Sequence, residues 1–378
     1  MLARLSRNRK FKFEWMQLFL LVVSFFLLAS WLSPTSYSAK KEEQPALKSE
    51  SVEVDRGHKM KKDSFNEGQD EIEEESECFI STVCTMFSDI SKVHQQNRCI
   101  LNKVRNWIIR SDWENAVFNY GLPASIYDVV GNDVGPKVTL SDLVSYLATQ
   151  FGEDTHYMEM GVSVGKTLYQ VLGIACQADI IAFDIEKINP TFEKILEPYF
   201  IESKIEENIQ GHDFGNKKNY ESFKKDDCSL TKYKLDLRNN GFHYLNCDEF
   251  DRLGWKRLKE LVSGFPKRPT LQVVFSDALH TFEAVRFEVE QVLSYELLDR
   301  ENFAYVWDDA SFSIQSFCDK IVKYASDAVK NRITCASGRL PGWQGINERN
   351  HQVALVTTID IKQILESHFQ NVKYFRQP

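Results

Sequence analysis

The chain has 378 residues, 43% of them apolar, which is enough for a sizeable core and excludes a disordered protein. Its formal net charge of −8 matches the charge of a single stretch, residues 63–77, which holds eight acids and no base, so the acidity of the whole chain says little about partners. The sequence shows no extended basic and aromatic surface, and nucleic acid is not an expected partner.

The first apolar segment, residues 15–31, follows a basic tail at residues 1–14. Its length is just sufficient to span a bilayer, and the basic residues before it predict a cytoplasmic N-terminus. We therefore expect a single-pass type II signal anchor, with the rest of the chain in a lumen or outside the cell. A cleaved signal peptide is the alternative, because Ser36 and Ser38 offer small residues at the spacing of a cleavage site. The anchor is favoured because the apolar run is longer than the roughly 7–15 residues of a signal-peptide core.

Residues 32–77 are polar and end in the acidic stretch, which predicts a linker between the membrane and a folded domain. Residues 78–146 have mainly helical apolar spacing and predict a helical extension in front of that domain. Within the extension, Thr139 and Asp142 stand where the capping residues of a helix are expected.

The eight cysteines include no Cys-x-x-Cys pair, which argues against a zinc ribbon or a thioredoxin-type site. Their even number permits disulfides in an oxidising compartment. Cys176 and Cys247 are equally consistent with small buried residues of the core.

Residues 156–190 are the most informative block. An apolar strand runs through Glu159, a glycine turn follows from Gly161 to Gly165, and a helix-length run leads to a second apolar strand that ends in Asp184. This order predicts a βαβ unit that binds a nucleotide at the glycine turn.

Two common phosphate-binding patterns do not fit this turn. A phosphate loop needs four residues between its first glycine and Gly-Lys-Thr, whereas three separate Gly161 from Gly165. The dinucleotide fingerprint is unmet as well, because Ser163 and Lys166 stand where its second and third small residues are expected.

Strand and helix patterns alternate through the rest of the chain, after a long polar insertion at residues 187–240. Further strands are predicted at residues 242–245, 271–276, 303–307, 353–358 and 372–375. Residues 147–378 are therefore predicted to form a doubly wound, mostly parallel, seven-stranded Rossmann-like α/β sheet, whose ligands collect at the carboxyl ends of the strands.

Acidic residues follow two of these strands. Asp277 comes directly after one strand, and Asp308 and Asp309 come directly after the next. Three carboxylates at one edge of a sheet repel each other unless a cation lies among them, and oxygen ligands suit Mg²⁺, Ca²⁺ or Mn²⁺. We therefore predict a divalent metal site, with Mg²⁺ as the preferred ion, although Asp309 could instead cap the next helix.

The pattern Glu159-x-Gly161-x-x-x-Gly165 resembles the first motif of class I S-adenosylmethionine-dependent methyltransferases. The pattern Asp-x-x-His-x-x-Glu from Asp277, with the later Asp-Asp pair, is similar to metal-dependent O-methyltransferases that act on the sugars of macrolide antibiotics and to cephalosporin-hydroxylase-like relatives. The resemblance covers about residues 140–358.

The resemblance implies a role for each matching residue. The backbone of Gly161 and Gly165 would approach the methionine part of S-adenosylmethionine after the strand that holds Glu159, which we include in the cofactor site. Asp184 would accept hydrogen bonds from the ribose hydroxyls. Asp248 stands where family members often contact the adenine, and it could equally be an acid of an exposed turn.

The metal roles of the family fall on Asp277, Asp308 and Asp309, and the role of general base falls on His280. A metal lowers the pKa of a sugar hydroxyl, and a neutral imidazole can take its proton as the methyl sulfonium is attacked. His280 could also be a structural residue that caps the following helix.

We expect a membrane-anchored O-methyltransferase that uses S-adenosylmethionine and a divalent metal, with a hydroxylated small molecule or a glycan as acceptor. The alternative is a binding or scaffold module that has lost catalysis, because many family members carry glycine where this chain has Ser163. A nicotinamide-dependent oxidoreductase is weakened by the unmet dinucleotide fingerprint. A luminal methyltransferase would also need imported cofactor, so the predicted location and the predicted activity are in tension.

Overall fold

The computed structural model describes residues 86–104, 108–110, 117–119, 137–174, 179–200, 205–211, 213, 228–234, 241–341 and 350–378. The predicted anchor at residues 15–31, with the tail before it and the linker after it, lies outside these ranges. Among the helices within them, none is long and apolar enough to cross a bilayer. The anchor stays a prediction from the sequence.

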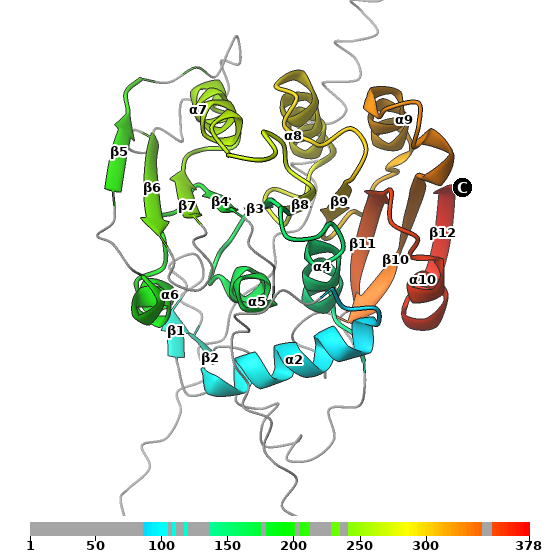
Figure 1. The fold of residues 1–378 in the computed structure, drawn as a ribbon, viewed down its shortest axis with the longest axis horizontal. Coiled ribbons are helices and arrows are strands. Elements are labelled where there is room, and N and C mark those ends of the chain that lie inside the picture. Colours follow the sequence, from blue (N-terminus) through cyan, green and yellow to red (C-terminus); the bar gives the residue numbers. More distant parts are fainter. Residues whose placement is uncertain are drawn as a thin grey trace, which may run out of the picture. The chain divides into compact units, whose positions relative to one another are not determined.

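One mixed sheet organises the described part of the chain (Figure 1). Its strands are β3 (Tyr157–Met160), β4 (Ile180–Asp184), β5 (Ile205–Ile209), β6 (Cys228–Lys234), β7 (Gly241–Asn246), β8 (Val273–Ser276), β9 (Ala304–Trp307), β10 (Thr334–Pro341), β11 (Asn350–Thr357) and β12 (Gln370–Arg376). Their order across the sheet is β12-β10-β11-β9-β8-β3-β4-β7-β6-β5.

The centre of the sheet is parallel and doubly wound. Strands β7, β4, β3, β8 and β9 all pair in parallel. The chain moves from β3 outward to β4 and β7 on one side, and later places β8 and β9 on the other side, so the order reverses between β3 and β8. Ligands of open α/β sheets bind at such a switch point, beyond the carboxyl ends of the strands.

The sheet is wider than the seven strands predicted. Beyond the parallel centre, β11 is antiparallel to β9, and β10 and β12 complete that side by antiparallel pairing. On the other side β6 and β5 add an antiparallel edge. Both of these strands lie in residues 187–240, whose polar sequence was interpreted as an insertion. The outermost strand, β5, is exposed or half-buried throughout and so gives no apolar pattern.

Every residue of β3, β4, β8 and β9 is buried, as their unbroken apolar runs predict for parallel strands covered on both faces. One face is covered by α2 (Ile90–Lys103), α4 (Leu140–Ala148), α5 (Lys166–Ile174), α6 (Pro190–Leu196) and α10 (Lys362–His368). The other face is covered by α7 (Arg252–Ser263), α8 (Phe282–Ser294) and α9 (Gln315–Tyr324) (Figure 1).

The predicted helical extension is only partly helical. It contains α2, but also a short antiparallel hairpin of β1 (Ile108–Arg110) and β2 (Val117–Asn119). The helix predicted at Thr139 is confirmed, since Thr139 and Asp142 form a reciprocal capping box at the start of α4. Asp142 is also bonded to His94 Nδ1 (2.8 Å) from α2. The extension is therefore packed into the same core as the sheet.

Two disulfides lie in the described part of the chain. Cys228 and Cys247 join β6 to the end of β7, and Cys318 and Cys335 join α9 to β10. Cys99 is disulfide-bonded too. The interpretation of Cys247 as an unpaired core thiol is wrong, because the β6–β7 pairing brings Cys228 opposite it. Cys176 lies outside the described residues.

Candidate active site

The glycine turn after β3 lies against the first residues after β8, at the switch point. The amide of Asp277 donates a hydrogen bond to the carbonyl of Met160 (2.8 Å). Gly161 has φ +76°, and a Cβ atom on it would lie 2.2 Å from the carbonyl oxygen of Asp277. Only glycine permits this approach. The segment predicted to hold the cofactor therefore contacts the first of the predicted metal residues.

Ser163, where many members of the resembled family carry glycine, adopts a backbone conformation that glycine favours. Ser163 has φ 50°, in the left-handed region, and its side chain is exposed. Gly165 has φ +76°, and a Cβ atom there would lie 2.9 Å from the ring of Phe192. A serine in this left-handed conformation costs about 1–2 kcal/mol of folding free energy relative to glycine.

The Asp184 carboxylate is built into the glycine turn. Its Oδ2 atom accepts hydrogen bonds from the amides of Val162 (2.6 Å) and Ser163 (2.9 Å). Its Oδ1 atom accepts one from the amide of Glu186 (2.8 Å), and the residue is only 7% exposed. Asp184 therefore lies where the ribose acid was predicted, and any ribose hydroxyl would share this carboxylate with the turn amides.

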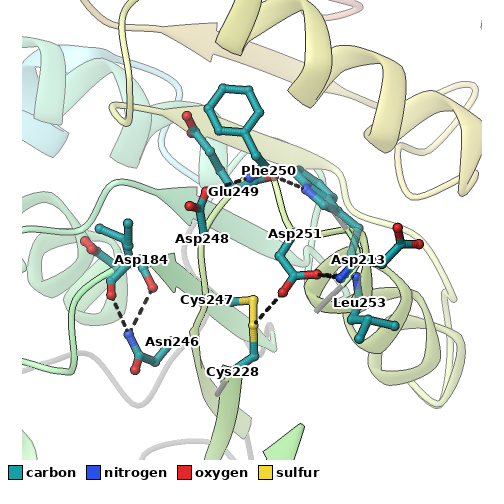
Figure 2. Close-up of a disulfide and its surroundings, with 12 residues drawn as sticks. Asp184, Asp213, Cys228, Asn246, Cys247, Asp248, Glu249, Phe250, Asp251 and Leu253 are labelled. Carbon is teal, nitrogen blue, oxygen red and sulfur yellow. Dashed lines mark hydrogen bonds between the residues drawn. A yellow bond between two sulfur atoms is a disulfide. The ribbon is translucent and has the colours of Figure 1, made fainter. Parts of the chain in front are cut away.

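Asp248 lies at the carboxyl end of β7, next to β4 (Figure 2). Its Oδ1 atom accepts a hydrogen bond from the amide of Phe250 (2.9 Å). This is the contact expected of an acid in a turn, which was the alternative role for Asp248. The loop is tied to the end of β4, because Asn246 Nδ2 donates to the carbonyl of Ile185 (2.8 Å) and the Cys247 amide donates to that of Asp184 (2.8 Å). Contact of Asp248 with adenine stays a prediction.

The Cys228–Cys247 disulfide lies directly beneath this loop (Figure 2). A carboxylate oxygen of Asp251 is 3.6 Å from Cys228 Sγ, and Asp251 also caps α7 by accepting from the amide of Leu253 (2.9 Å). These two cysteines and Asp251 have the spacing of metal ligands. Because the sulfurs are bonded to each other, they offer no thiolates to a metal.

Two ionisable side chains are buried below the turn. Glu159 is 2% exposed and accepts a hydrogen bond from the hydroxyl of Tyr157 (2.6 Å), and burial raises its pKa to about 8. Lys166 is 6% exposed, with Nζ 3.3 Å from Ser141 Oγ, and burial lowers its pKa to about 7. Glu159 is thus bonded within its own strand, and its predicted contact with the cofactor is untested.

Two of the three predicted metal residues lie together, with a histidine that the sequence did not single out. Asp308 Oδ2 is 2.7 Å from Nδ1 of His351. Asp308, Asp309 and His351 each offer one ligand atom, and these atoms lie within 4.8 Å of one another. Asp308 is 6% exposed, whereas the Asp309 side chain is 56% exposed. The set is open to solvent on the side of Asp309.

Asp277 lies next to this set. Burial and the neighbouring carboxylates of Asp308, Glu159 and Asp309 raise its pKa well above the usual value. Because 38% of its side chain is exposed, repulsion between the carboxylates is the better supported of these causes. His280 Nε2 lies 3.6 Å from Asp277 Oδ1.

Both helix-cap alternatives are wrong. The N-cap of α8 is Thr281, whose hydroxyl accepts from the amide of Ala284, so His280 does not cap that helix. The N-cap of α9 is Ile314, so Asp309 does not cap that helix either. Asp309 instead has φ 44° immediately after β9. Both residues are left with side chains at the carboxyl edge of the sheet.

His351 could have been found from the direction of its strand. β11 is antiparallel to β9, so the start of β11 lies beside the end of β9, and the Ala310 amide donates to the carbonyl of Gln352 (2.8 Å). A reversed strand places its first residues, rather than its last, at the ligand-binding edge. Only residues that end or follow strands were considered as ligands from the sequence, so a histidine at the start of a strand was missed.

No protein-family model matches the sequence, and no curated protein matches it. Methyltransferases are among the solved structures that the chain matches. One is an rRNA methylase from Streptococcus thermophilus (10% identity, 57% of this chain and 93% of that chain, TM-score 0.29). Another is an O-methyltransferase from Bacillus cereus in complex with SAH (12% identity, 73% and 93%, TM-score 0.28). A third is the MycE methyltransferase of mycinamycin biosynthesis with Mg, SAH and mycinamycin VI (14% identity, 55% and 43%, TM-score 0.26).

The doubly wound, mostly parallel Rossmann-like sheet that the sequence predicted is confirmed in its centre by the arrangement of the elements. The central strands form a doubly wound sheet, and the glycine turn lies at its switch point.

Proposed function

We propose that this chain is an S-adenosylmethionine-dependent methyltransferase that O-methylates a hydroxylated small molecule or sugar with the help of a divalent metal. The contact between Gly161 and Asp277 supports this proposal most directly. It brings a turn of the kind that holds a sulfonium cofactor next to acids of the kind that hold a metal. Methyl transfer from a sulfonium mostly requires alignment and removal of one proton, and these two parts would supply both.

S-adenosylmethionine would supply the methyl group when bound. Gly161 and Gly165 would let its methionine part approach the backbone, and Asp184 and Asp248 would face its ribose and adenine. The turn is already held by the hydrogen bonds that its Val162 and Ser163 amides donate to Asp184, so its shape does not need to form on binding. Pre-organisation of this kind lowers the entropic cost of binding.

The donor atoms near Asp308 fit a divalent metal. Carboxylates suit Mg²⁺ and Mn²⁺, and the imidazole of His351 adds a ligand that Mn²⁺ and other transition metals accept more readily than Mg²⁺. A bound cation would relieve the repulsion that raises the pKa of Asp277. It would supply Lewis acidity that lowers the pKa of the acceptor hydroxyl.

His280 would take the proton of the acceptor hydroxyl. Its side chain is 37% exposed, and Asp277 lies close enough to orient the ring. Solvent exposure also gives the proton a route out of the site after transfer.

Calorimetric titration of the full-length protein with S-adenosylmethionine tests the proposal. We expect Asp184→Asn and Asp184→Ala to weaken binding at least about tenfold, because the carboxylate holds the turn and faces the ribose. Asp154→Ala is the matched control, because Asp154 precedes β3 at the opposite edge of the sheet and pairs with Lys267. No detectable binding by the wild-type protein would overturn the proposal. Binding without methyl transfer to a broad panel of hydroxylated acceptors would support the scaffold alternative instead.

We further propose that the domain faces a lumen or the cell exterior. The Cys228–Cys247 and Cys318–Cys335 disulfides support this location, because cytosolic proteins keep most thiols reduced. In sealed microsomes the C-terminus should be protected from added protease until detergent is present. Complete digestion without detergent would contradict this topology.

A further inference from the structure

Two exposed apolar side chains flank His280. Leu279 is 50% exposed and Phe282 is 37% exposed. Single exposed apolar residues are common on protein surfaces and need no explanation. Here, however, Leu279 belongs to the short segment between Asp277 and α8, and Phe282 is the first residue of α8. Both therefore adjoin Asp277 and His280, which are two of the predicted catalytic and metal residues.

The apolar surface continues onto the segment after β9. The ring of Phe282 lies 5.9 Å from that of Phe312, in an edge-on arrangement, and 5.2 Å from that of Phe317. Phe317 is buried in α9 and anchors the group, while Phe312 is half-buried in the segment that follows Asp309. The two segments that carry the acids therefore also share one aromatic cluster.

The segment that carries Leu279 and Phe282 is fixed in place by its own contacts. The Thr281 hydroxyl caps α8, and the Thr281 amide donates to the carbonyl of Leu279 (2.9 Å). The carboxylate of Glu249, from the loop after β7, is hydrogen-bonded to the backbone of Leu279. These bonds fix the backbone on both sides of His280. The exposed positions of Leu279 and Phe282 are therefore set by the fold.

We propose that Leu279 and Phe282 are specificity-determining residues that bind an apolar ring of the acceptor next to its reacting hydroxyl. This inference rests on the proposed function. The acids and His280 would bind and deprotonate the hydroxyl, and Leu279 and Phe282 would bury the ring. Acceptors without an apolar group would therefore bind weakly. The acceptor class is therefore a hydroxylated compound with an aromatic or alicyclic group, rather than a fully polar glycan.

Phenyl β-D-glucopyranoside and methyl β-D-glucopyranoside are suitable probes, because they carry the same sugar hydroxyls and differ in the apolar ring. Their dissociation constants from the full-length protein can be measured by ligand-observed NMR in the presence of S-adenosylhomocysteine. We expect the phenyl compound to bind at least about tenfold more tightly. Phe282→Ser and Leu279→Ser should each remove most of this preference. Ile205→Ser is the matched control, because Ile205 is 59% exposed on the edge strand β5 and should leave the preference unchanged.

The same variants separate this inference from the proposed function. Unchanged binding of S-adenosylmethionine, with the ring preference lost in Phe282→Ser, would support the inference. Equal affinity of the wild-type protein for the two glucosides, or a preference that survives Phe282→Ser, would overturn it even if the cofactor binds. Failure of the cofactor to bind any variant would count against the proposed function alone. If Phe282→Ser instead dissociates a dimer in sedimentation, the surface is an interface between copies and the inference is wrong.

Discussion

The Cα atom of Gly161 faces the carbonyl of Asp277 so closely that a methyl group added to it would lie 2.2 Å from that oxygen. Gly161→Ala must therefore push apart the segments after β3 and β8, besides straining a backbone at φ +76°. We expect a loss of about 2–4 kcal/mol in the free energy of unfolding and of most cofactor affinity. Chemical denaturation and calorimetric titration of the same preparation measure the two effects.

Gly152→Ala is the control for this prediction. Gly152 has a similar φ of +83°, but a Cβ atom there would meet nothing within 4 Å. It should therefore cost only the backbone strain, about 1–2 kcal/mol, and leave cofactor affinity unchanged. If the two substitutions changed the free energy of unfolding and the cofactor affinity equally, the contact with Asp277 would contribute to neither.

The sequence predicted those site residues that directly end or follow an apolar strand of the parallel sheet. Asp184, Asp277 and Asp308 end or follow buried parallel strands, and such strands place their last residues at one edge of the sheet. His351 was missed because the direction of its strand depends on pairing with β9, which is a contact between residues far apart in the chain. Strand β6, which lies between β7 and the edge strand β5, was missed because its polar residues gave no clear alternation.

The metal site predicts different results for the two histidines near it. His351→Ala should weaken Mn²⁺ binding at least about tenfold, because His351 is grouped with Asp308 and Asp309 as a ligand. His280→Ala should leave Mn²⁺ affinity nearly unchanged and lower kcat, because His280 is the proposed base and is not in the group of possible ligands. Electron paramagnetic resonance titration of Mn²⁺ gives the affinities. Unchanged affinity in His351→Ala would exclude His351 as a ligand.

Lys166 predicts a pH dependence of stability. Burial lowers its pKa from 10.5 to about 7, so the folded protein holds this proton less tightly than the unfolded chain. Below pH 7 both states are protonated and the folded state bears the full cost of a buried charge. As the pH rises from 7 towards 10.5, that cost disappears and the contribution of Lys166 becomes more favourable.

Lys166→Met should therefore stabilise the protein most at pH 6, and the gain should shrink by pH 9. We expect about 1–3 kcal/mol at pH 6, because the substitution also removes the contact with Ser141 and the attraction of nearby carboxylates. Urea denaturation at the two pH values measures the change. Lys267→Met, at an exposed lysine, should show no such difference between pH values. A destabilised Lys166→Met protein at pH 6 would mean that the charge is paired rather than merely buried.

The two disulfides whose cysteines both lie in the described ranges should differ in their effect on cofactor binding, although each should stabilise the fold. They close loops of similar length, with sequence separations of 19 and 17 residues, so replacing either pair by serine should cost about 2–4 kcal/mol. Only the Cys228–Cys247 disulfide adjoins Asp248, and the Cys247 amide also holds the carbonyl of Asp184. Its removal should weaken S-adenosylmethionine binding several-fold at a temperature where the protein remains folded. The double variant of Cys318 and Cys335 should keep wild-type affinity. If both variants bind the cofactor equally well, then cofactor binding by the loop that carries Asp248 does not depend on the disulfide.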